Sequence, residues 1–99
     1  MRAFLLLHEK KLVLHKTTDE LAIVEIKIWR VPKSRFYGKG IKYSLYLVHN
    51  GVILLGFDNH KPKGPHLHLD GREEKYAFKS SKKLLKDFWE LVESRGYKL

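Results

Sequence analysis

The sequence predicts an α+β fold, in which one C-terminal helix packs across an antiparallel meander sheet of about four to five strands. Apolar side chains alternate with period two through much of the first half, as in half-buried strands. Asn50-Gly51 supplies the positive φ angles of a tight hairpin turn between two such runs. Near the C-terminus the apolar period changes to three and four residues, which indicates a helix. Without repeats or linkers, residues 1–99 are interpreted as a single domain.

Three segments carry the main strands. The stretch FLLLHEKKLVLH, residues 4–15, is either one bent strand or two short ones. Residues 21–31 form a second run that Pro32 ends, because proline cannot donate to a strand ladder. One face of that run holds Ala22, Val24, Ile26 and Ile28. Residues 41–59 are read as a hairpin around the Asn-Gly turn.

The C-terminal third adds an edge element and the helix. The segment REEKYAFKS, residues 72–80, could add an edge strand through Tyr76 and Phe78. The helix follows, with Ser80 as a suitable N-cap and Gly96 where a left-handed residue commonly ends a helix. Its apolar stripe consists of Leu84, Leu85, Phe88, Trp89, Leu91 and Val92.

The charge balance points to an anionic partner. Twenty Lys and Arg face eleven Asp and Glu, a formal net charge of +9. Such an excess on a small chain attracts polyanions, and nucleic acid is the first candidate. A lysine-rich surface kept for solubility is the alternative. The absence of cysteine excludes disulfides, zinc ribbons and thiol nucleophiles, and it fits the cytoplasm. No apolar run approaches the ~20 residues that span a bilayer, so we expect no membrane association.

The stretch DNHKPKGPHLHLDGREE, residues 58–74, carries the chemistry-bearing side chains. Period-two alternation after Pro65 places His66 and His68 on one side of a short strand, about 7 Å apart at their Cα atoms. We expect both on an exposed strand. His60 lies nearby in the same loop.

Three interpretations of this cluster remain open. In the first, RNA is cleaved without metal or cofactor: His66 and His68 act as acid and base, and Asp58 orients an imidazole. Cations that would neutralise the phosphate in this case are Lys61, Lys63 and Arg72. In the second, His66 and His68 bind a metal together with Asp58 or Glu73. In the third, the stretch is a polar loop whose histidines have no catalytic role.

A second basic segment precedes the hairpin. WRVPKSRFYGKGIKY, residues 29–43, interleaves basic residues such as Arg35 with aromatic ones such as Phe36. This mixture suits single-stranded RNA, through phosphate contacts and base stacking. An ordinary loop between strands is the alternative.

The order of these features resembles the TumE-like proteins, the toxin components of two-gene toxin–antitoxin modules. The motifs IWRVP, GFDNHKPKGPHLHLDGREEKYAF and LLKDFWELV carry the resemblance, which covers nearly the whole chain. The most specific block runs from Phe57 to Glu74. The residues that match this block are Asp58, Asn59, Gly64, His66, His68, Arg72 and Glu73. His60 and Pro65 are local choices of this sequence.

The resemblance implies an adjacent helix-turn-helix-type antitoxin as partner and a cytoplasmic target, RNA or translation. The primary hypothesis is therefore a toxin that acts on RNA as a metal-independent endoribonuclease. The alternative of a different class is a basic module that binds nucleic acid or protein without catalysis. A small metal-dependent enzyme is the third hypothesis, and a homodimer stays open.

Overall fold

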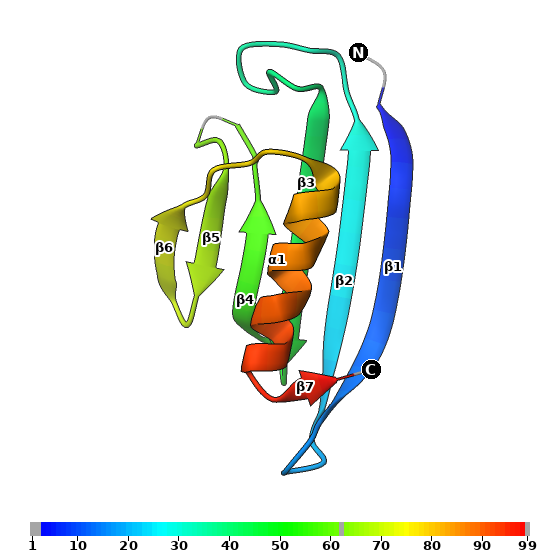
Figure 1. The fold of residues 1–99 in the computed structure, drawn as a ribbon, viewed down its shortest axis with the longest axis vertical. Helices are drawn as coiled ribbons and strands as arrows, with labels where there is room; N and C mark the ends of the chain where they lie inside the picture. Colours follow the sequence, from blue (N-terminus) through cyan, green and yellow to red (C-terminus); the bar gives the residue numbers. More distant parts are fainter. Residues whose placement is uncertain (1–2, 62, 99) are drawn as a thin grey trace.

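The computed structural model describes residues 3–61 and 63–98, and these form one antiparallel sheet with a helix across one face (Figure 1). Within them the sheet has seven strands in the order β6-β5-β4-β3-β2-β1-β7. The elements are β1 (Phe4–His15), β2 (Leu21–Arg30), β3 (Ile41–His49), β4 (Val52–Asp58), β5 (His66–Leu69), β6 (Arg72–Lys75), α1 (Ser81–Ser94) and β7 (Tyr97–Lys98). The first six strands therefore follow one another as a meander.

The predicted α+β class, meander and C-terminal helix are confirmed, but the sheet has seven strands rather than four to five. The three strands beyond β1–β4 are β7 and the two strands of a second tight hairpin, β5–β6, whose turn is Asp70-Gly71 with φ angles of +50° and +82°. The edge strand expected in residues 72–80 forms only at Arg72–Lys75. Beyond it, Tyr76 and Phe78 leave the sheet and pack on the core instead.

The N-terminal segment is one continuous strand, which settles the choice between one bent strand and two short ones. Its pairing with β2 shifts register between Leu5 and Leu7, so the bend is a β-bulge. At its other end, β1 pairs with the two-residue strand β7 through Leu14 and His15. The chain after α1 therefore returns to the sheet and pairs with β1 at its edge.

The core lies between the sheet and α1. Leu84, Phe88 and Val92 of the helix are fully buried against alternate residues of the strands. Burial of a side chain of this kind stabilises the fold by about 1.5–3 kcal/mol. The helix begins where predicted, since Ser80 Oγ accepts a hydrogen bond of 3.1 Å from the Lys83 amide. It ends before Gly96, whose φ of +89° is the expected left-handed conformation.

The sheet therefore has a covered face, against α1, and a face with no helix on it among the described residues (Figure 1). The strand register determines which side chains reach this uncovered face. One row runs across six adjacent strands and consists of His8, Lys27, Ser44, Asp58, His66 and Lys75. The next row includes Tyr46, Gly56, His68 and Glu73. The candidate site lies where these two rows cross β4 and β5.

Candidate functional site

Pairing between β4 and β5 brings the predicted catalytic residues together. Asp58 is the last residue of β4 and lies opposite His66, while Gly56 lies opposite His68. Because side chains of one strand alternate between faces, Asp58, His66 and His68 all project from the uncovered face. The sequence placed the two histidines on one side; the register adds the carboxylate to them.

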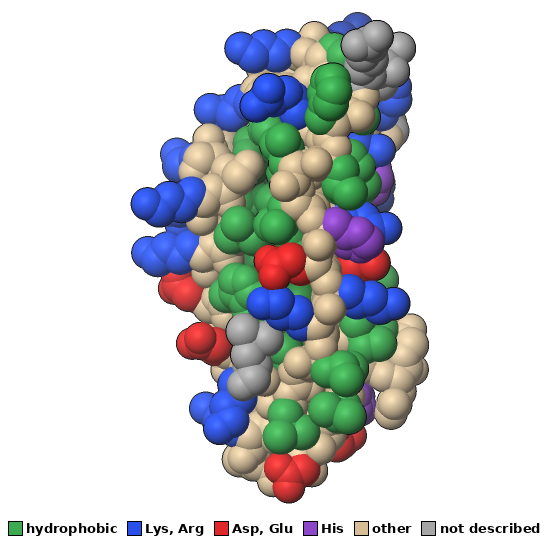
Figure 2. Space-filling model, turned by 90° about the vertical axis from the view of Figure 1, so that its right-hand side faces the viewer, with side chains coloured by type: hydrophobic (Ala, Val, Ile, Leu, Met, Phe, Trp, Pro, Cys, Tyr) green, Lys and Arg blue, Asp and Glu red, His purple; other side chains and the backbone are tan. Residues whose placement is uncertain are grey.

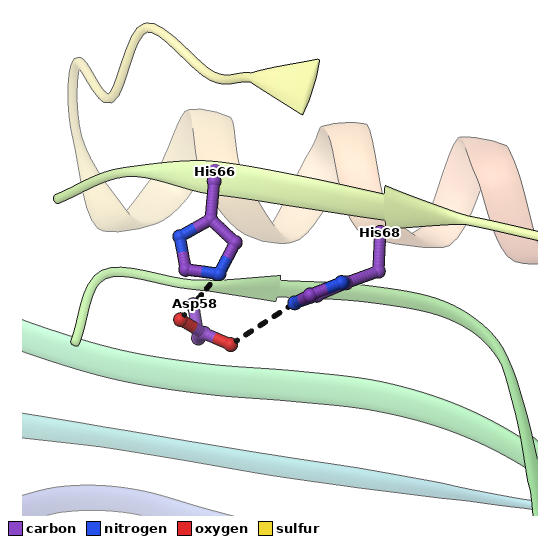
Figure 3. Close-up of side chains that lie close together, drawn as sticks. All are labelled: Asp58, His66 and His68. Carbon is purple, nitrogen blue, oxygen red and sulfur yellow. Dashed lines mark ion pairs between the residues drawn. The ribbon is translucent and has the colours of Figure 1, made fainter. Parts of the chain in front are cut away.

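Asp58 lies between the two imidazoles (Figure 3). Its Oδ1 is 3.0 Å from His66 Nε2, and its Oδ2 is 3.6 Å from His68 Nε2. The two rings meet edge to face, with centroids 4.8 Å apart. Exposure of the side chains is 5% for Asp58, 10% for His66 and 33% for His68. The expected exposed position is therefore wrong for His66, which the β4–β5 pairing buries, and only His68 is accessible.

The second nitrogen of His66 defines its protonation. Nδ1 is 2.8 Å from the Gly64 carbonyl oxygen, which only accepts hydrogen bonds, so Nδ1 carries a proton. In a neutral imidazole Nε2 then lacks a proton and would face a second acceptor, Asp58. The contact is favourable when either a proton or a cation lies between Nε2 and Asp58.

Tyr46 completes the surroundings of the carboxylate. Its hydroxyl donates a short hydrogen bond to Asp58 Oδ2, and the His60 amide donates to Oδ1 at 3.3 Å. Burial and the bond to Asp58 raise the pKa of Tyr46 well above its usual range, so the hydroxyl stays a donor. The ring lies over Gly56, where an added Cβ would be only 2.4 Å from two ring carbons. Glycine at this position therefore makes room for Tyr46.

Glu73 and Lys63 form the rim of the site. Lys63 Nζ donates to both carboxylate oxygens of Glu73, at 2.9 and 3.1 Å, and Glu73 Oε1 is 3.5 Å from His66 Nε2. The hydrogen bond from Lys63 holds the pKa of Glu73 below its usual value, and the nearby histidines act in the same direction. Lys63, predicted to contact phosphate, is thus beside the histidines but paired with an acid.

Asn59 fixes the chain directly after Asp58. Its side-chain oxygen accepts from the Tyr43 amide at 2.9 Å, and its nitrogen donates to the Ile41 carbonyl at 2.8 Å. The buried amide replaces the strand pairing that β4 would otherwise continue. The chain directly after Asp58 is therefore held against β3.

The remaining predicted contact residues divide into two groups. Lys61 and Arg35 meet at Phe36, with their charged groups 5.7 and 5.0 Å from the ring centroid. The structure does not bring Arg72 to the histidines: it lies opposite Leu69, one position out of phase with His68 and Glu73. Lys75, opposite His66, is the basic residue of β6 on the uncovered face.

Sequence reasoning missed Tyr46, Gly56 and Lys75. Tyr46 lies between the buried Leu45 and Leu47, so the alternation of the strand predicts that its side chain projects from the opposite, uncovered face. A glycine inside an apolar strand is a signal for a close approach by another group. Neither signal identifies Asp58 as the shared neighbour, because that depends on the register between β3 and β4.

Chemically, the cluster can transfer protons or hold a metal. A buried carboxylate between two imidazoles, one of them accessible, suits acid–base catalysis. The same three side chains each offer one ligand atom, and these atoms lie within 4.8 Å of one another. A carboxylate and two imidazoles form an accepted donor set for divalent transition metals.

Comparison with known proteins identifies the family. The family model for toxin TumE matches residues 3–96, whereas no curated protein and no solved structure matches the chain. Within residues 3–61 and 63–98, no helix is long and apolar enough to cross a membrane. The match covers the whole of α1 and every strand of the sheet except β7. Membership of a toxin family implies a cognate antitoxin as partner. The chain belongs to the TumE toxin family and is the toxin of a toxin–antitoxin module.

Proposed function

We propose that this toxin acts on RNA as a metal-independent endoribonuclease, with His66 and His68 as its acid and base. The observation that carries the proposal is the buried Asp58, whose two oxygens face the two imidazoles at 3.0 and 3.6 Å. A carboxylate in this position can accept a hydrogen bond from either ring, so it orients both imidazoles at the place where an acid and a base are needed.

The exposure of the two histidines suggests how the roles are divided. Neutral His68, the accessible ring, takes the proton of the ribose 2′-hydroxyl. The 2′-oxygen attacks the phosphorus, and the bond from phosphorus to the 5′-oxygen breaks. Protonated His66 is assigned the proton that the leaving 5′-oxygen needs, which requires its Nε2–H, directed at Asp58 in the free toxin, to turn toward the substrate when RNA binds. The products are a 2′,3′-cyclic phosphate and a free 5′-hydroxyl, and the two histidines have exchanged protonation states.

RNA binding is supported by cations around the site. Lys27 and Lys75 lie in the same row as Asp58 and His66. At one end of the sheet, Lys42 Nζ lies 5.4 Å from the centroid of the Trp29 ring, and Lys61 and Arg35 lie at Phe36. Cations beside exposed aromatic rings bind single strands by phosphate contact and base stacking. The cytoplasm, where RNA is abundant, is the proposed place of action.

The partner is proposed to be a helix-turn-helix-type antitoxin encoded beside this toxin. This proposal depends on the resemblance of the sequence, since the family match implies an antitoxin but not its fold. A homodimer stays a prediction.

The test uses purified toxin and a labelled RNA in the presence of EDTA. We expect cleavage to continue, and the fragments to carry 2′,3′-cyclic phosphate and 5′-hydroxyl ends. The Asp58→Asn variant, which keeps the shape and removes the charge, should cleave at least tenfold more slowly. An intact RNA, together with growth arrest in cells, would instead favour a basic module that binds without catalysis.

A metal-dependent enzyme is the second candidate, and one specific observation favours it. Histidines that bind a metal usually donate their other ring N–H to a carbonyl or carboxylate, as His66 does to Gly64. Asp58 and His68 provide the other two ligand atoms. In this case the protein should bind about one zinc or manganese ion per chain by calorimetry, His68→Ala should weaken that binding, and EDTA should abolish cleavage.

A further inference from the structure

The two edges of the sheet differ in how they are protected. At one edge, β6 is four residues long and all of them are charged, which discourages pairing with another chain. At the other edge, β1 is twelve residues long, and β7 pairs only with Leu14 and His15. On that side, no strand among the described residues pairs with residues 4–13, so their outward backbone groups are open (Figure 1). Such an edge is a template for a further strand.

Apolar side chains accompany this open backbone. Phe4, Leu5, Leu6 and Leu12 are 57%, 54%, 50% and 63% exposed. Leu12 also begins an apolar row on the uncovered face that continues through Ile23, Val48 and Ile53. Figure 2 views the molecule from the β1 side, where hydrophobic side chains lie along the length of the view and charged side chains interrupt them near its middle. Exposed apolar side chains gathered on one surface in this way mark interaction sites.

The charges on the middle of β1 favour an acidic partner. Lys10 and Lys11 are adjacent and project from opposite faces of the strand. Lys11 contacts Glu9 at 3.1 Å, whereas Lys10 forms no ion pair with any residue in 3–61 or 63–98. A strand added along β1 would therefore meet one lysine on each of its faces. The formal net charge of +9 acts in the same direction.

A second copy of this chain fits the edge less well. In an antiparallel pairing of two identical strands, the two-fold axis sets one residue opposite its own copy. An axis at Glu9 or Lys10 would place like charges opposite each other, which destabilises the pairing. An axis at His8 would place Lys10 against an apolar Leu6. A different chain, with acids at the positions that face the lysines, avoids both problems.

We propose that the cognate antitoxin binds the toxin by adding an extended segment to the open edge of β1. Its main chain would bond to the outward backbone groups of residues 4–13, with acidic side chains at Lys10 and Lys11 and apolar ones at Phe4 and Leu12. The inference rests on the toxin–antitoxin assignment and not on RNA cleavage. Four strand spacings, roughly 19 Å, separate β1 from β5. Binding at the edge and chemistry at the histidines can therefore be tested separately.

The first experiment measures amide hydrogen exchange of the full-length toxin, alone and with the purified antitoxin encoded beside its gene. We expect exchange at outward-facing amides of residues 4–13 to slow at least tenfold in the complex, with little change in β6, the matched edge. Protection of β6 or α1 without protection of β1 would overturn the proposal, as would failure of the two proteins to associate. If β1 is protected in the toxin alone, and the protection increases with toxin concentration, the edge binds a second copy of the toxin and the proposal is overturned.

The second experiment measures the dissociation constant for the same antitoxin after charge reversal. Lys10→Glu with Lys11→Glu should weaken binding at least tenfold, while RNA cleavage by the free variant is unchanged. The matched control is Lys82→Glu with Lys86→Glu, which makes the same change in net charge on exposed positions of α1. Equal weakening by both pairs would show a general charge effect and contradict a specific edge contact. Loss of cleavage alone, with binding intact, would bear on the proposed function only.

Discussion

Gly56 offers a quantitative test of how the site is built, because its replacement by alanine acts through one identified contact. The new Cβ would lie 2.4 Å from two carbons of the Tyr46 ring, so the ring must move. Overpacking of this kind costs about 1–3 kcal/mol, and alanine regains about 0.5–1 kcal/mol through its lower backbone entropy. The middles of these two ranges differ by about 1 kcal/mol, so we expect Gly56→Ala to lower the free energy of unfolding by about this amount.

The same substitution should change sign when the ring is removed. In a Tyr46→Ala background the nearest remaining atom is the Leu45 carbonyl oxygen at 3.4 Å, an ordinary contact. Gly56→Ala should then stabilise the protein by about 0.5 kcal/mol. Urea unfolding of the wild type, the two single variants and the double variant measures the coupling directly. An equal effect of Gly56→Ala in both backgrounds would refute the inferred contact and the role of glycine in positioning Tyr46.

Three further predictions concern RNA binding, the loop after β4 and acid stability. If about five phosphates of single-stranded RNA are contacted, log affinity should fall with log salt at a slope of about −3.5, and a slope near zero would exclude nucleic acid as the partner. Asn59→Ala leaves a buried amide and carbonyl unpaired and should cost about 2–4 kcal/mol in urea unfolding; a loss below 1 kcal/mol would contradict its structural role. The hydrogen bond from Lys83, and then that from Tyr76, hold the pKa of Asp87 below its usual value. This carboxylate contributes stability above its unfolded pKa of about 4, and the contribution is lost as pH falls through the lower folded pKa. Stability curves of wild type and Asp87→Asn should therefore converge in acid, and a constant difference would refute the assignment.

The fold was largely predictable because its signals are local. Asn50-Gly51, the capping Ser80 and the change of apolar period each act within a few residues, and the structure confirms all of them. The Asp70-Gly71 turn is an equally local signal whose significance the sequence reading did not recognise. Strand β7 could not be predicted in this way, since two residues form a strand only because α1 returns them to β1.

The site was less predictable because it depends on register. A two-residue turn after Leu69 sets Arg72 opposite that leucine and Glu73 opposite His68, so the acid and not the arginine joins the histidines. The alternation of residues in a single strand cannot show which residue of the next strand lies opposite. The contact between Tyr46 and Asp58 likewise requires the pairing of β3 with β4.

The most direct test of the account is the rate of RNA cleavage by the His68→Ala variant in the presence of EDTA. His68 is the accessible member of the cluster, so its replacement should leave the protein folded. The account predicts a rate at least 10²-fold below that of the wild type, with RNA affinity nearly unchanged. His49→Ala, at the end of β3 and outside the cluster, is the matched control and should cleave at the normal rate. Wild-type cleavage by a folded His68→Ala variant would contradict the central claim that the Asp58–His66–His68 cluster performs the chemistry.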